Sequence, residues 1–139
     1  AEAAVLTAAA TARHIVTAPS GARAEAAVGP DGSVAVRVWC GDPLDEVVLR
    51  SYCIGAAHMA LGWVRREGLA VSPDGTPQDL TIRSFGVLRA KDMPAVTVEI
   101  ADRSGPPLAV SDAVVAAVAA AAWRADGHPT DWPTQRRNP

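Results

Sequence analysis

The stretch Cys53-Ile-Gly-Ala-Ala-His-Met-Ala-Leu-Gly-Trp-Val64 decides the fold, because it is small and apolar over about three helical turns. It completes a predicted helix over residues 44–64, which Asp42 would cap and Pro43 would begin. The first half of this helix has an expected inward side, Leu44, Val47 and Val48, and an expected outward side, Asp45, Glu46 and Arg50. A helix that is apolar on every side is enclosed by other protein, so the second half predicts a partner surface.

Upstream of this helix, the sequence predicts a β-hairpin. Residues 22–28 alternate small apolar with charged side chains, and residues 33–39 are rich in valine. Between them, Gly29-Pro30-Asp31-Gly32 is typical of a tight turn, because proline presets one backbone dihedral and glycine accepts positive φ. Residues 1–13 are alanine-rich and predict a helix within an N-terminal helical lead-in over residues 1–19.

Downstream, the clearest signal is a strand over residues 95–100. Its alternation places Val96, Val98 and Ile100 on one face, and Thr97 and Glu99 on the other, with Glu99 in solvent. A shorter strand is expected over residues 69–71, and residues 80–88 have a mixed pattern that predicts partly irregular structure.

The last regular element is a predicted helix over residues 113–123. Either Ser111 or Asp112 would cap it, and Gly127 would terminate it. Residues 127–139 lack periodicity and predict an extended C-terminal tail.

These elements predict one α+β domain over residues 1–139. A small mixed sheet, made of the hairpin and the later strands, would pack with two main helices. In the tail, Trp132 is expected to bury its ring on a neighbouring surface.

Composition excludes several classes of function. A formal net charge of -2 gives no electrostatic footprint for nucleic acid. Cys40 and Cys53 lack Cys-x-x-Cys spacing, so no metal site is expected. Two cysteines allow one disulfide, but in a domain of this size reduced thiols are the favoured interpretation. Acidic Glu2 and the absence of a basic start argue against a signal peptide. The longest apolar run, residues 113–123, is shorter than the roughly 18 residues of a membrane span. We therefore expect a cytoplasmic protein with no membrane segment.

General catalytic motifs are missing from the sequence. It contains no glycine-rich phosphate loop, no Gly-x-Ser-x-Gly elbow and no His-Glu-x-x-His helix. His58, in the apolar half of the long helix, allows two interpretations. It is either a core histidine with one satisfied nitrogen or a proton donor to a bound group.

Several segments match, in order, motifs of a known enzyme family. The family motifs are a helix start of the type GQIEGGIVQGLGW, an Asp-rich turn, DYRIP, DVPEIEVEF, GVGEPPL, a closing helix and LPLTPERV. The counterparts here are Ser51-Tyr-Cys-Ile-Gly-Ala-Ala-His-Met-Ala-Leu-Gly-Trp63, residues 72–75, Asp79-Leu-Thr-Ile-Arg83, Asp92-Met-Pro-Ala-Val-Thr-Val-Glu-Ile100, Arg103-Ser-Gly-Pro-Pro-Leu108, residues 113–123 and Asp131-Trp-Pro-Thr-Gln-Arg136. From about residue 20 onward the chain thus resembles the C-terminal part of the molybdopterin-binding large subunit of the xanthine dehydrogenase, aldehyde oxidase and carbon monoxide dehydrogenase family.

The resemblance implies a site at the molybdenum-pterin cofactor, and it also shows departures from the family pattern. Tyr52 and Met59 stand where the family has helix glutamines, and Gly105 stands where it has the general base, a glutamate. Glycine has no proton acceptor in its side chain, so no catalytic residue is carried over. The resemblance implies that Tyr52, His58, Met59 and Gly105 line or approach the cofactor, with no metal ligand among them. The cofactor would be held mainly by a partner chain, and this chain alone would bind no cofactor.

Two hypotheses about function follow from the resemblance. In the first, the chain is a small subunit, or a split-off C-terminal part, of a xanthine dehydrogenase-type molybdenum hydroxylase. It would complete a larger molybdopterin-binding chain, together with iron-sulfur and flavin chains, and would not be active alone. In the second, it is a catalytically dead homologue that acts as a binding or assembly protein and forms a homo-oligomer.

Overall fold

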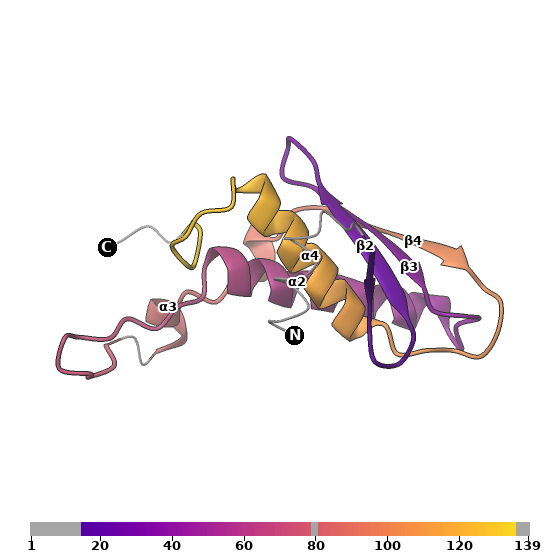
Figure 1. Cartoon of the computed structure of the whole chain (residues 1–139), viewed down its shortest axis with the longest axis horizontal. Coiled ribbons are helices and arrows are strands. Elements are labelled where there is room, and N and C mark those ends of the chain that lie inside the picture. Colours follow the sequence, from indigo (N-terminus) through magenta and orange to yellow (C-terminus); the bar gives the residue numbers. More distant parts are fainter. Residues whose placement is uncertain (1–14, 79–80, 136–139) are drawn as a thin grey trace.

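One four-stranded sheet forms the right-hand side of the molecule in Figure 1. The computed structural model describes residues 15–78 and 81–135. The strands, in the order β1-β2-β3-β4 across the sheet, are β1 (Ile15–Thr17), β2 (Arg23–Val28), β3 (Val34–Trp39) and β4 (Val96–Asp102). The first two pairings are antiparallel and the third, β3 with β4, is parallel. The predicted hairpin is confirmed as β2 and β3, and the sheet is mixed.

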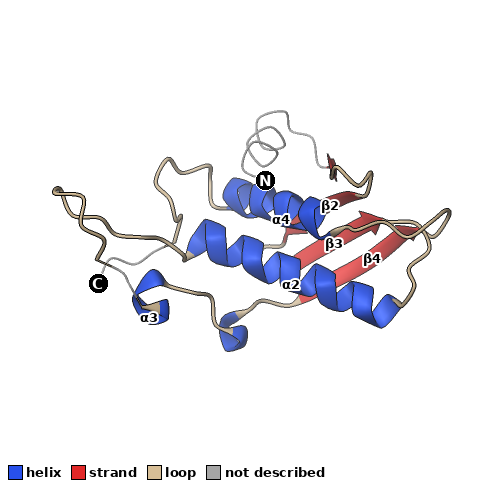
Figure 2. Cartoon of the chain, turned by 90° about the horizontal axis from the view of Figure 1, so that it is seen from below, coloured by secondary structure: helices blue, strands red, loops and turns tan. Residues whose placement is uncertain are grey.

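Two long helices cover one face of this sheet, as Figure 2 shows. They are α2 (Glu46–Arg65) and α4 (Ser111–Ala125), and shorter turns form α3 (Ile82–Phe85) and the 3-10 helix η1 (Ala90–Asp92). Because β3 and β4 are parallel and α2 connects them, α2 begins at the end of the sheet where both strands finish. The α4 helix begins at this same end, since it follows β4.

The core lies between the sheet and the two helices. Val34, Val36 and Val38 of β3 are buried, whereas the intervening Ala35 and Arg37 face away from the helices. Nine residues of α4, most of them alanine, are also buried. Small side chains on α4 permit close approach to α2 and to β2, so much of the core is made of backbone and methyl groups. The expected α+β class, a mixed sheet packed with two main helices, is confirmed.

The start of α2 differs from the prediction. Asp45, not Asp42, caps the helix, because Asp45 is extended (φ -149°) and its Oδ1 accepts from the N–H groups of Val47 at 2.8 Å and Val48 at 3.0 Å. Asp42 lies in the preceding loop, where its N–H donates to the Gly105 carbonyl. Proline at position 43 therefore precedes the helix instead of opening it.

Two predicted elements near the N-terminus and in the middle of the chain are also corrected. Residues 15–17, placed in a helical lead-in, form the edge strand β1 and pair with β2. Residues 1–14 lie outside the described residues. The strand expected over residues 69–71 is reduced to a single bridge between Val71 and Pro77, because Pro73-Asp74-Gly75 turns the chain back at once.

The C-terminal region is more closely packed than the predicted extended tail. Helix α4 begins at Ser111, after Val110, and neither predicted cap makes a side-chain capping bond. Beyond Gly127, the N–H of Thr134 donates to the Val64 carbonyl at 2.8 Å. The Trp132 ring lies 5.0 Å from the Trp63 ring, on the end of α2. Residues 136–139 are not among those described.

By length and composition, α2 could cross a membrane. This corrects the expectation that no segment is long and apolar enough. In the structure, however, α2 lies beside α4 on one face of the sheet, and core helices of water-soluble proteins meet the same two criteria.

Candidate functional site

The α2 helix presents an apolar face to solvent, contrary to the inward orientation predicted for its first half. Leu44 just before the helix is 93% exposed, Val47 is 75% exposed and Val48 is 48% exposed. The buried residues instead follow a helical repeat on the other side, and they are Cys53, Ala56, Ala57, Ala60, Leu61, Gly62 and Val64. Because these buried residues define the side of α2 that faces the core, Val47 and Val48 point away from the sheet.

The second half of α2 is also open on this side, although it was expected to be enclosed. Tyr52 and Met59 are each 64% exposed, and Ile54 is exposed as well. No atom lies within 4 Å of a Cβ added at Gly55. We call the set Leu44, Val47, Val48, Tyr52, Ile54, Gly55 and Met59 the open face of α2. The apolar surface that the sequence predicts on this half of the helix is therefore exposed along one side only.

A loop of residues 103–110 lies beside the start of this face. The Gly105 carbonyl accepts from the Asp42 N–H at 3.1 Å, and the Leu108 N–H donates to the Cys40 carbonyl at 2.8 Å. Gly41 (φ +70°) is required here, because an added Cβ would overlap the Pro106 carbonyl. The loop is thus fixed to the segment that connects β3 with α2.

Between the loop and α2 lies an apolar hollow of about 190 Å³. It is lined by Cys40, Pro43, Leu44, Asp45, Val48, Leu49, Tyr52, Pro107 and Leu108. Tyr52 is the one predicted site residue in this lining. The hollow joins the open face of α2 to the loop that carries Gly105.

The other predicted site residues are distributed over α2 and the loop. Met59 shares the side of α2 on which Tyr52 lies, about two turns further along. His58 is half-buried on a different side, where its Nε2 lies 2.8 Å from the Leu88 carbonyl oxygen. Gly105 has positive φ (+86°), and a Cβ added there would meet nothing within 4 Å. The structure therefore brings together Tyr52 and the Gly105 loop, and it places His58 apart from them.

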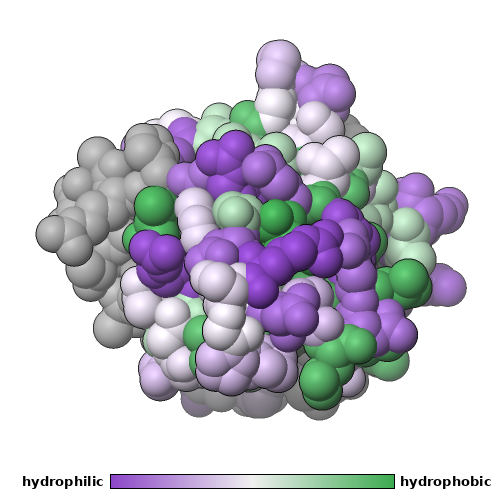
Figure 3. Space-filling model, turned by 90° about the vertical axis from the view of Figure 1, so that its right-hand side faces the viewer, coloured by the Kyte–Doolittle hydropathy of each residue, from purple (hydrophilic) through white to green (hydrophobic). Residues whose placement is uncertain are grey.

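Sequence reasoning missed an ionic cluster that ties the loop to α2. The Glu46 carboxylate pairs with Arg103 of the loop and with Arg50, each at 2.6 Å. The hydrogen bonds from Arg103 and Arg50 lower the pKa of the Glu46 carboxyl group. Arg50, predicted to face outward, is half-buried and also donates to the Val98 carbonyl of β4. Figure 3 faces this end of the molecule and shows hydrophilic and hydrophobic surface side by side.

The two cysteines are free and buried. Burial raises the pKa of both thiols, that of Cys53 to about 11, so they are neutral near pH 7. Over residues 15–78 and 81–135, no group of three His, Cys, Asp or Glu side chains could hold a metal ion. This end of the molecule can therefore offer apolar surface, a phenol and backbone groups to a ligand.

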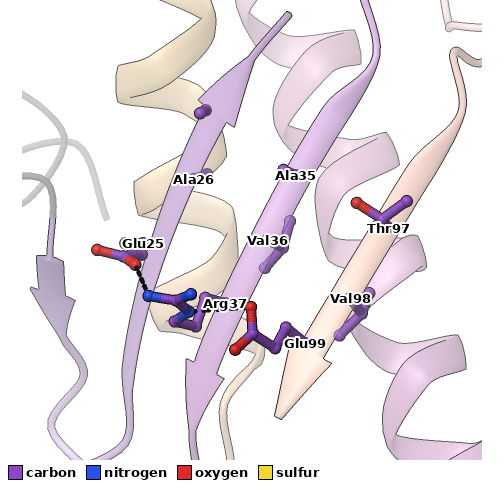
Figure 4. A pocket seen from close by; sticks show the side chains of 9 residues that line it. Glu25, Ala26, Ala35, Val36, Arg37, Thr97, Val98 and Glu99 are labelled. Carbon is purple, nitrogen blue, oxygen red and sulfur yellow. Dashed lines mark hydrogen bonds and ion pairs between the residues drawn. The ribbon is translucent and has the colours of Figure 1, made fainter. Parts of the chain in front are cut away.

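The face of the sheet that points away from the helices carries a second ionic group (Figure 4). Arg37 lies between Glu25, at 3.3 Å, and Glu99, at 3.1 Å. Around them Ala26, Ala27, Ala35, Val36, Thr97 and Val98 line an open hollow of about 560 Å³. Glu99 was expected to be solvated, and its side chain is 60% exposed while it pairs with Arg37. The two carboxylates raise the pKa of Arg37, so the group is a surface ion cluster and not a source of protons.

No protein-family model matches the chain, and no curated protein matches it in sequence. Solved structures do resemble it. Quinoline 2-oxidoreductase from Pseudomonas putida 86 superimposes on 72% of the chain with a TM-score of 0.59 and 13% identity. The Cu,Mo-CO dehydrogenase in its carbon monoxide reduced state superimposes on 82% with a TM-score of 0.61 and 12% identity.

These similarities concern the fold. The chain spans only 14% and 17% of the length of those two chains. Sequence identities this low carry no information about activity. The chain accordingly has an α+β fold that is found as a small part of the quinoline 2-oxidoreductase and Cu,Mo-CO dehydrogenase chains.

Proposed function

We propose that this chain is a component of a molybdenum hydroxylase complex, in which it completes a larger molybdopterin-binding chain and is not active alone. The observation that carries the proposal is the open face of α2, six of whose seven residues are large apolar side chains at least 42% exposed. A contiguous exposed apolar patch of this kind marks an interaction surface. The shared fold, which forms a minor share of two much longer chains, supports the larger chain as the partner.

The partner would cover the open face of α2 and extend over the loop at Gly105. Iron-sulfur and flavin chains would complete the assembly, which we place in the cytoplasm. The molybdenum-pterin cofactor would be held mainly by the partner. Tyr52 fits a lining role, because its exposed ring stands in the hollow beside the loop. His58 fits less well, since its Nε2 already bonds the Leu88 carbonyl.

This chain lacks the proton acceptor that the resemblance places at position 105. Gly105 offers only backbone groups, and its carbonyl is already bonded to the Asp42 N–H. The contribution of this chain to a reaction would therefore be to exclude water from the cofactor and to shape the cofactor cavity through Tyr52, Met59 and the loop. Any base would have to come from another chain.

The second candidate function is an assembly protein that has lost catalysis. It is favoured by the same glycine at position 105, together with a face that a second copy could cover. In that case two copies would bury their α2 faces against each other, and the protein would carry no molybdenum. The two functions therefore predict different partners for one surface.

The test uses purification of the natural complex and a single substitution, Gly55→Leu. We expect the chain to purify with a larger chain and with molybdenum, measured by elemental analysis. In Gly55→Leu, the added side chain should abolish this association, because it projects into the interface. The variant alone should gain about 0.5–1 kcal/mol of stability, since leucine has a higher helix propensity than glycine.

A matched control is Ala125→Leu, at the exposed last residue of α4, which should leave the association intact. A symmetric dimer without molybdenum, disrupted by Gly55→Leu, would favour the assembly protein. A monomeric, metal-free chain that binds no partner, with an elution profile unchanged in Gly55→Leu, would contradict both functions.

A further inference from the structure

A cavity at the other end of α2 gathers arginine side chains from three separate segments. Its volume is about 580 Å³, within the range of about 300–1,000 Å³ that small-molecule sites occupy. The lining residues are Arg66, Ile82, Arg83, Gly86, Val87, Leu88, Arg89 and Asp92. Neither the open face of α2 nor the Gly105 loop takes part in it.

Local backbone structure explains how these segments meet. Arg66 is the C-cap residue of α2, and Arg83 belongs to the short helix α3. The turn after α3 passes directly over the end of α2, because Gly86 (φ +87°) has no Cβ to overlap the Arg66 carbonyl. A hydrogen bond from the Gly68 N–H to the Phe85 carbonyl, at 3.0 Å, joins the same two regions.

The charges in this cavity are not balanced. Arg89 pairs with Asp92 at 2.6 Å, and Asp92 is the single carboxylate in the lining. Within the described part of the chain, the guanidinium groups of Arg66 and Arg83 have no hydrogen-bond or ion-pair partner. Lys91 adds a further positive charge beside Asp92. An excess of positive charge in a concave surface attracts anions, although the chain as a whole is negative.

Four arginines outside this cavity are neutralised by carboxylates of the chain, whereas Arg23 lies over the Trp39 ring and Arg124 Nη1 is buried with no hydrogen-bond partner among the described residues. Arg37, Arg50, Arg65 and Arg103 each pair with a carboxylate of the chain. Arg66 and Arg83 differ from these four because their guanidinium groups, which have no ion pair among the described residues, face a common cavity.

We propose that this cavity binds the phosphate group of a small anionic molecule. Guanidinium groups donate paired N–H bonds to oxyanions, and a phosphate group carries about -1.5 to -2 charges near pH 7. Arg66 and Arg83 supply donors that no group in residues 15–78 and 81–135 satisfies, while Arg89 donates through the atoms left free by Asp92. Ile82, Val87 and Leu88 provide an apolar wall for the rest of the ligand. This site is independent of the proposed molybdenum partner.

The experiment measures binding of inorganic phosphate and pyrophosphate to the 139-residue chain by calorimetry, with ionic strength held constant by chloride. We expect saturable binding at one site. Arg66→Gln and Arg83→Gln should each weaken it about tenfold or more, as loss of a charged hydrogen-bond partner does. The control Arg23→Gln, whose guanidinium lies over the Trp39 ring, should leave the affinity unchanged.

Circular dichroism of every variant checks that the fold is retained. Absence of saturable binding by a folded wild-type chain would overturn the proposal, and so would an equal loss in Arg23→Gln, which would indicate general charge attraction. A further arm uses phosphatidylcholine vesicles with and without phosphatidic acid. If the chain binds the acidic vesicles but not free phosphate, the ligand of this cavity is a lipid headgroup and not a small molecule. That outcome would also overturn the proposal.

Discussion

At its carboxyl end, α2 is covered by the segment that follows α4, whereas nearer its amino end one apolar side is left exposed by the described residues. The closed end, as we call it, consists of Trp63, Arg65, Asp126 and Trp132, with Arg65 bonded to Asp126 through two N–H groups at 3.0 and 3.1 Å. At the amino end, the apolar side chains of the open face project into solvent. One helix thus has a carboxyl end covered by its own chain and an apolar side, nearer the amino end, that the described residues leave exposed.

The largest expected effect comes from breaking the closed end with Asp126→Ala. The carboxylate also accepts from Thr134 Oγ1 at 2.5 Å and from Gln135 Nε2 at 3.0 Å, and its own side chain is only 10% exposed. Its removal leaves the Arg65 guanidinium nearly buried and unpaired, which should cost about 3 kcal/mol of unfolding free energy. Urea denaturation measures this cost.

The matched control for this substitution is Glu99→Ala, which breaks an exposed ion pair and should cost less than about 1 kcal/mol. Equal losses in Asp126→Ala and Glu99→Ala would remove the distinction between the closed end and the rest of the surface.

A smaller difference in stability is expected between substitutions of Trp132 at the closed end and Tyr52 on the open face. Trp132→Ala removes the contact with Trp63 and should cost about 1 kcal/mol, the contribution of an aromatic pair. Tyr52→Ala on the open face should change the stability of the isolated chain by less than about 0.5 kcal/mol, because the side chain is mostly in solvent. Thermal unfolding of both variants makes the comparison. A large loss in Tyr52→Ala would mean that the open face is already covered.

The smallest expected effect is a change in the pKa of Glu46, whose carboxylate links the start of α2 to the loop of residues 103–110. Arg103 and then Arg50 lower the pKa of this carboxyl group in the folded state. Its stabilising contribution is therefore complete above the pKa of the unfolded chain and is lost as the pH falls through the lower folded pKa. An NMR titration should show the midpoint rising in Arg103→Gln, yet staying below the ordinary value because Arg50 remains. A midpoint unaffected by this substitution would show that the loop is not held by the ion pair.

Local patterns were sufficient to predict β2, β3, β4 and the two long helices, but not β1, whose residues were placed in a helical lead-in. The turn at residues 29–32 and the alternation of Val34, Val36 and Val38 predicted the hairpin, because turn chemistry and a period of two act over a few residues. Helix ends were predicted less well. Asp42, Asp45, Ser111 and Asp112 all suit a helix cap, and tertiary contacts such as the bond from Asp42 to Gly105 select among them.

The site was predicted only in part. Tyr52 and the Gly105 loop do lie at one end of the molecule, whereas His58 bonds to Leu88, a residue thirty positions away in sequence. The arginine cavity gave no signal in the sequence. Arg66, Arg83 and Arg89 are spaced irregularly, and only the close approach of Gly86 to the end of α2 places them together.

The sequence by itself determined that an apolar helix, a hairpin and a final strand would form one mixed α+β domain, since propensity and hydrophobic period are properties of neighbouring residues. Only the tertiary structure decided which side of α2 is buried. Cys53, Ala57 and Val64 are buried in the core, and this orientation of the helix turns Val47, Tyr52 and Met59 to solvent. A helix with apolar residues on all sides has no preferred face of its own, so its orientation is set by whichever neighbours the rest of the chain provides.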